Sequence, residues 1–206
     1  MLTSFDGVSL WRPWNIDPSW KTQSGQAWFH IDQHPISKPG KQCIQGLINL
    51  LPTSEEIGGN VVIPKSHNFF KDLPEEYKER VERLPLDIDH FRFPHDDPKL
   101  SSEPAVMAHM EPGDMLLWDS RTIHCSSSGS SLPEGTNDLI RAASLICMMP
   151  KELSSKEIIE KRIHAAENLV STTNWTNDFR NADEFPIILE AENRDQYKCC
   201  LLYTSD

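Results

Sequence analysis

Short segments of strand-forming residues, separated by prolines and glycines, follow one another through the first 150 residues. Regularly spaced short strands with turn signals between them are typical of an all-β sandwich or barrel. We therefore predict a mainly β protein. The eight strands that we expect cover residues 7–12, 27–32, 42–51, 60–64, 105–110, 114–118, 122–126 and 139–149.

Two segments have a helical pattern instead. Residues 74–84 (PEEYKERVERL) begin with proline and glutamates, which favour the first turn of a helix. A second helix is expected from Ser154 or Ser155, where Ser154 and Glu157 can form a capping box. We expect its one-sided stripe to pack against the sheet; the stripe consists of Ile158, Ile159, Arg162, Ile163, Ala166 and Leu169. The long stretch 68–103, between the fourth and fifth strands, is expected to cover a site.

The length of 206 residues predicts one domain. We expect a core barrel over about residues 5–150 and a helical, irregular extension over 151–206. The chain has neither an apolar run near the roughly 20 residues of a membrane span nor a signal peptide at its start, so a cytoplasmic location is expected. Five cysteines, an odd number without C-x-x-C spacing, predict reduced thiols.

The charge balance restricts the class of partner. The formal net charge is −11, from 31 acidic and 20 basic residues. Such a surface repels a phosphate backbone, so we expect no nucleic-acid partner. It still allows a small anionic ligand, which needs only one local basic residue.

A candidate metal site lies in the second predicted strand. His30 and Asp32 are two positions apart, so their side chains share one face. His124, which follows a Gly-Asp turn and an apolar strand, is the best-placed second histidine. Two histidines and one carboxylate on one face suit a non-haem iron(II) oxygenase. The alternative for His30 and Asp32 is a polar pair on a surface strand.

Arg141 is a candidate anion-binding residue, because it lies in an otherwise apolar strand, LIRAASLI. A buried arginine is costly unless it pairs with an anion, and its planar fork suits a carboxylate. The sequence contains no obvious acidic partner for it. A dicarboxylate cosubstrate would supply one.

An ordered series of motifs resembles the phytanoyl-CoA dioxygenase family over about residues 4–150. The series is WFHIDQ (28–33), QGLINL (45–50), GGNVVIPKSH (58–67), GDMLLWDSRTIH (113–124) and Arg141. The order of all five is far more specific than any one of them.

The resemblance implies a double-stranded β-helix (a cupin-like jelly roll) with a few flanking helices. It implies an iron(II)- and 2-oxoglutarate-dependent dioxygenase that uses O2 to hydroxylate a small or lipid-like organic substrate. The metal ligands that it implies are His30, Asp32 and His124. Arg141 is expected to hold the far carboxylate of 2-oxoglutarate, and Gln45 and Ser126 to make further contacts with this cosubstrate.

Two alternatives remain open. Only 29 residues precede His30, fewer than in most of the family, so the chain is also compatible with a truncated, catalytically silent member. A cupin-like metal-binding protein would hold zinc or another ion and pair Arg141 internally. Five further histidines show no converging partner in the sequence and are expected to be solvated or structural; they are His34, His90, His95, His109 and His164.

Overall fold

The structure, a computed structural model, describes residues 1–4, 7–21, 28–86, 88–167 and 174–177. Contacts divide the chain into two compact units. One is Val8–Leu145, and the other joins Met1–Gly7 to Ile146–Asp206. The predicted single domain stays a prediction.

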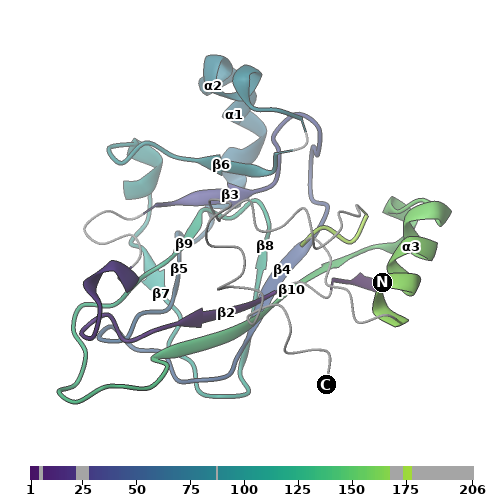
Figure 1. Ribbon diagram of the computed structural model, residues 1–206. Coiled ribbons are helices and arrows are strands. Elements are labelled where there is room, and N and C mark those ends of the chain that lie inside the picture. The colour runs from purple at the N-terminus through teal and green to yellow at the C-terminus, as the bar shows by residue number, and fades with distance from the viewer. Residues whose placement is uncertain (5–6, 22–27, 87, 168–173, 178–206) are drawn as a thin grey trace. The chain divides into compact units, whose positions relative to one another are not determined.

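Two five-stranded antiparallel sheets make up most of the fold, and this confirms the predicted mainly β, jelly-roll class. In the unit Val8–Leu145, one sheet has the order β2 (Val8–Trp11), β10 (Arg141–Met149), β4 (Ile44–Asn49), β8 (Met115–Asp119) (Figure 1). The other has the order β6 (His90–Arg92), β3 (His30–Asp32), β9 (His124–Ser126), β5 (Asn60–Val62), β7 (Val106–Met107). All eight predicted strands are present, and the two further strands, β1 (Leu2–Thr3) and β6, were not predicted.

The β3-containing sheet has two chemically different faces because side chains alternate along each strand. One face is an apolar core formed by Phe29, Ile31, Ile63, Phe91, Phe93, Ile123 and Cys125. The insertion between β5 and β7 packs on this face through Phe70, Leu73 and Val81. The insertion helices therefore cover the apolar face, whereas β6 of the same stretch pairs with β3.

The helix predicted over 74–84 is broken into shorter pieces. The segment contains the 3-10 helix η2 (Ser66–Asp72), then α1 (Leu73–Glu76) and α2 (Lys78–Arg83). Tyr77 separates the two α-helices with φ −116° and ψ 33°. Its ring packs edge-on against Phe91 and Phe93, and its hydroxyl donates to Asp97. These tertiary contacts accompany the break in the helix.

In the second unit, β1 (Leu2–Thr3) pairs with the end of β10. The 3-10 helix η4 (Lys151–Leu153) leads to α3 (Lys156–Glu167). The cap is the Ser155 hydroxyl, which accepts from the Ile158 amide at 3.2 Å, and not the predicted Ser154. The predicted stripe was partly wrong: Arg162 is buried as expected, but Ile163 and Ala166 are exposed and the buried alanine is Ala165. Its last member, Leu169, lies outside the described residues.

The remaining 3-10 helices are η1 (Pro18–Trp20) and η3 (Pro98–Ser101). Within the described part of the chain, no helix has the length and apolar character needed to cross a bilayer. The described cysteines Cys43, Cys125 and Cys147 are free and buried, as expected for reduced thiols.

Gly58 precedes β5 in a conformation that only glycine adopts readily, with φ +101°. A Cβ here would lie 2.2 Å from the Ser127 carbonyl oxygen. We expect Gly58→Ala to lower the free energy of unfolding by more than the ~1–3 kcal/mol of backbone strain alone. Gly40→Ala is the matched control, because Gly40 has φ +71° but open space around it. Urea unfolding of the two variants measures the difference; equal losses would contradict the steric argument.

Candidate metal centre

The strand register brings the polar side chains to one face. His30 of β3 lies opposite His124 of β9, and Asp32 of β3 lies opposite His90 of β6. Directly opposed residues of antiparallel strands point to the same side. Four potential metal donors, from strands far apart in the sequence, therefore share the face opposite the apolar core.

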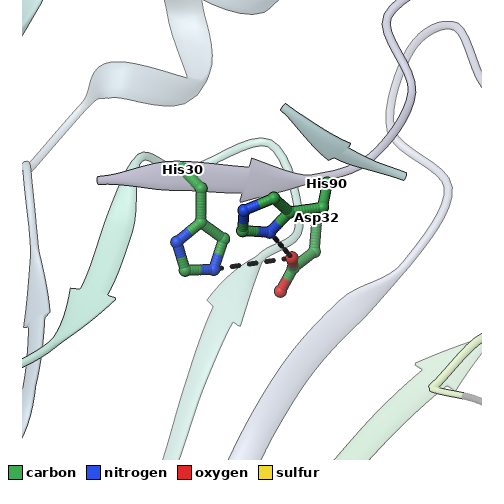
Figure 2. A group of neighbouring side chains, drawn as sticks. All are labelled: His30, Asp32 and His90. Carbon is green, nitrogen blue, oxygen red and sulfur yellow. Dashed lines mark ion pairs between the residues drawn. The ribbon is translucent and has the colours of Figure 1, made fainter. Parts of the chain in front are cut away.

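The Asp32 carboxylate is the centre of this cluster. Its Oδ1 lies 3.5 Å from His30 Nε2 and 3.6 Å from His90 Nδ1, and its Oδ2 lies 3.3 Å from His124 Nε2. Figure 2 shows His30 and His90 turned toward the Asp32 carboxylate. Two ligands about 2.1 Å from one ion and at right angles to each other are about 3.0 Å apart. The measured spacings to Asp32 are slightly longer than that value, and the donor atoms of His30, Asp32 and His90 all lie within 4.8 Å of one another, so these three fit around a single ion.

Backbone hydrogen bonds set the tautomer of both predicted histidine ligands. Nδ1–H of His30 donates to the Trp28 carbonyl at 3.0 Å, and Nδ1–H of His124 donates to the Thr122 carbonyl at 2.9 Å. A carbonyl only accepts, so Nδ1 must carry the proton and Nε2 the lone pair. This is the usual second hydrogen bond of a metal-ligating histidine. Both lone pairs are thus presented on the side of Asp32.

The surroundings favour the protonation states that bind a metal. Burial lowers the pKa of His30, and this outweighs the opposing effect of Asp32. Burial alone would raise the pKa of Asp32, but the neighbouring His30, His124 and His90 hold it well below its ordinary value. At neutral pH the set is a carboxylate with a neutral His30, as metal binding requires. Imidazole and carboxylate donors of this kind suit iron(II).

Gln45 of β4 reaches across to the same carboxylate. Its side-chain amide donates to Asp32 Oδ2 at 3.0 Å, and its carbonyl oxygen accepts from Trp118 Nε1 at 3.1 Å. Trp118 in turn packs against the His124 ring, with centroids 5.2 Å apart. Gln45 therefore orients the Asp32 carboxylate; its predicted contact with the cosubstrate stays a prediction.

We expect Gln45→Leu to weaken metal binding by about 10-fold, because a ligand deprived of its outer hydrogen bond is less well oriented. Competition with a chelator, using cobalt(II), measures the dissociation constant. Gln42→Leu is the control, because the Gln42 amide donates only to the Pro39 carbonyl on the surface. An unchanged affinity in Gln45→Leu would show that Asp32 needs no such support.

Arg141 is buried, as predicted, with 1% of its surface exposed. Burial lowers the pKa of its guanidinium to about 10, so the group is still charged at neutral pH. Its Nη1 donates to the Ser126 hydroxyl at 3.4 Å, and its Cζ lies 4.1 Å from the centre of the Trp11 ring. The Nε atom of Arg141 is buried without a hydrogen-bond partner. In the described part of the chain, no ion pair joins the Arg141 guanidinium to an acidic residue.

The structure brings His30, Asp32 and His124 together, with Gln45 against Asp32 and Ser126 against Arg141. The residue that sequence reasoning missed is His90. Among the described residues, His30, Asp32 and His90 form a group whose donor atoms all lie within 4.8 Å of one another. The alternation of His90 and Arg92 with two buried phenylalanines is a strand pattern that could have revealed it.

Comparison with known proteins gives the family. The family described as Phytanoyl-CoA dioxygenase (PhyH) matches residues 16–132. A curated relative, "Ava biosynthesis cluster protein O" of Aspergillus versicolor, is 30% identical over 181 residues. The match covers 84% of this chain but 54% of the relative, so the chain spans about half the length of that protein.

Two solved structures are similar at lower identity. AviO1 from Streptomyces viridochromogenes Tue57 is 16% identical, with a TM-score of 0.41, over 70% of this chain and 48% of that one. EvdMO1 is 21% identical, with a TM-score of 0.38, over 60% of this chain and 23% of that one.

The matched residues 16–132 include the three predicted ligands, and the donor set has the chemistry of a non-haem iron(II) site. Iron(II) as cofactor and 2-oxoglutarate as cosubstrate are therefore supported by both the sequence match and the site. The chain belongs to the phytanoyl-CoA dioxygenase family of iron(II)- and 2-oxoglutarate-dependent oxygenases.

Proposed function

We propose that this chain is an iron(II)- and 2-oxoglutarate-dependent dioxygenase that hydroxylates a small or lipid-like organic substrate. The observation that carries the proposal is that a histidine–carboxylate cluster and a buried arginine lie near each other. Two histidine Nε2 atoms flank one carboxylate, and a buried arginine lies nearby without an acidic partner among the described residues.

In this proposal the Nε2 atoms of His30 and His124 and the Asp32 carboxylate would hold the metal. Iron(II), when bound, supplies the oxygen-activating redox chemistry. The Trp28 ring stacks on His30 with centroids 4.4 Å apart and shields that ligand from water. Gln45 holds the carboxylate in the orientation that the metal needs.

In this proposal Arg141 and Ser126 bind the distal carboxylate of 2-oxoglutarate. Ser126 is two residues beyond His124 on β9, so its side chain lies on the same face about 7 Å along the strand. From a carboxylate oxygen at one end of 2-oxoglutarate to one at the other there are six bonds, four C–C and two C–O. Two residues of backbone also span six bonds, so the two lengths are similar. The cosubstrate is thus long enough to reach from the metal to the Arg141–Ser126 pair.

The substrate proposed here is a small organic molecule. The name of the Aspergillus versicolor relative places that protein in a biosynthesis cluster, which supports a low-molecular-weight biosynthetic intermediate as the substrate class. The cytoplasmic location and the absence of nucleic-acid partners stay predictions.

The function is tested by following 2-oxoglutarate in aerobic solution. We expect protein reconstituted with iron(II) to convert 2-oxoglutarate to succinate, measured by mass spectrometry, above the level given by Asp32→Ala. Candidate small organic substrates should raise the yield further. A wild-type yield no higher than that of Asp32→Ala, with every substrate tried, would contradict the proposed activity.

A further inference from the structure

His90 enters the metal centre from a different direction than the two predicted histidine ligands. It stands on β6, the edge strand of its sheet, and its ring lies 4.4 Å from that of His30, centroid to centroid. The His90 side chain is 44% exposed, whereas those of His30 and His124 are each 6% exposed. His90 therefore occupies the solvent side of the centre.

The contacts of His90 have the geometry of a ligand. Its Nδ1 is 3.6 Å from Asp32 Oδ1, nearly the same distance as His30 Nε2, at 3.5 Å, from that oxygen. A neutral imidazole presents its Nδ1 lone pair as readily as Nε2 to a metal. His30, Asp32 and His90 can thus surround one ion from adjacent positions (Figure 2).

We propose that His90 is a fourth protein ligand of the metal, through Nδ1, until 2-oxoglutarate binds and displaces it. The inference rests on the proposed function. Three protein ligands would leave three positions on the metal, of which 2-oxoglutarate would take two and dioxygen would need the third. With His90 still bound, 2-oxoglutarate would fill the last two positions and leave none for dioxygen, so we expect His90 to be released when 2-oxoglutarate binds.

The place of β6 in the sheet makes such a departure possible. Among the described strands β6 is an edge strand that pairs only with β3, so a shift of His90 disturbs no second strand of this set. His30 and His124 have no such freedom, because each is buried and its Nδ1–H is held by a backbone carbonyl. His90 would keep the metal bound in the resting protein, and the other two would hold it during turnover.

The test counts ligating imidazoles in the cobalt(II) protein. Each coordinated neutral imidazole keeps one exchangeable N–H, whose proton resonance is shifted by the paramagnetic ion. We expect three such resonances without 2-oxoglutarate and two with it. His90→Phe, which keeps a ring beside His30 and Trp28, should show two in both states. The exposed His95→Phe is the matched control and should behave as wild type.

Affinity provides a second readout that does not depend on activity. Without 2-oxoglutarate, His90→Phe should bind cobalt(II) at least about 10-fold more weakly than wild type; with saturating 2-oxoglutarate the two should agree. In the absence of 2-oxoglutarate, two resonances in wild type and an equal cobalt(II) affinity in His90→Phe would overturn the inference. This result would leave the proposed function intact. Three resonances in wild type that persist when 2-oxoglutarate is added would show that His90 is not displaced, which would overturn that part of the inference. Wild-type protein that binds no cobalt(II) would overturn both proposals.

Discussion

Replacing Asp32 with alanine is expected to abolish iron binding and turnover. The carboxylate is the only anionic donor in the cluster that the structure describes, and it lies within 3.6 Å of the nitrogens of His30, His90 and His124. Loss of an outer-sphere group alone costs 10- to 100-fold in metal affinity, so loss of this ligand should cost at least about 100-fold. Chelator competition with iron(II) under anaerobic conditions measures the affinity.

The metal-free Asp32→Ala protein should still fold, because the apolar core lies on the opposite face of the sheet. Circular dichroism checks this point. Asp96→Ala is the control, since Asp96 is an exposed aspartate on the loop after β6 and should leave iron binding unchanged. A folded Asp32→Ala variant with wild-type iron affinity would remove Asp32 from the metal site.

Replacing Arg141 with methionine is expected to weaken 2-oxoglutarate binding strongly without destabilising the free protein. A hydrogen bond to a charged group contributes about 1.5–3 kcal/mol. This corresponds to about 10- to 150-fold in the dissociation constant. The free protein should be as stable as wild type or more so, because the buried charge has no acidic partner among the described residues. Calorimetric titration and urea unfolding measure the two effects.

Arg121→Met is the matched control. Arg121 is paired with Asp119, with two contacts of 2.8 Å, so its loss should affect stability and leave the affinity for 2-oxoglutarate unchanged. If Arg141→Met instead lost stability and kept its 2-oxoglutarate affinity, the arginine would be structural and the site would need another carboxylate partner.

The sequence predicted those parts of the site that depend on spacing within one strand. The shared face of His30 and Asp32 follows from the two-residue period of a β-strand, and the burial of Arg141 follows from its apolar neighbours. The pairing of His30 with His124 is a long-range contact, which no local spacing contains. His124 was selected from its place after a Gly-Asp turn and an apolar strand and then by the family resemblance, and the register supports this choice.

His90 was missed because β6 has only three residues and lies in a stretch predicted as a covering insertion. Its partner in the register is Asp32, 58 positions earlier in the chain, so tertiary pairing and not local sequence places it. The break of the helix at Tyr77 has the same origin. The ring and hydroxyl of Tyr77 contact residues of β6 and the following loop, and such contacts override helix propensity.

The central claim is that this chain binds iron(II) and 2-oxoglutarate together at one centre. Anaerobic titration of the iron(II) protein with 2-oxoglutarate tests it most directly, because chelation of iron by the keto acid produces a weak visible charge-transfer band. We expect the band in wild type, its loss in Asp32→Ala, and its appearance only at higher 2-oxoglutarate in Arg141→Met. A folded wild-type protein without the band, when an established oxygenase shows it under the same conditions, would contradict the account.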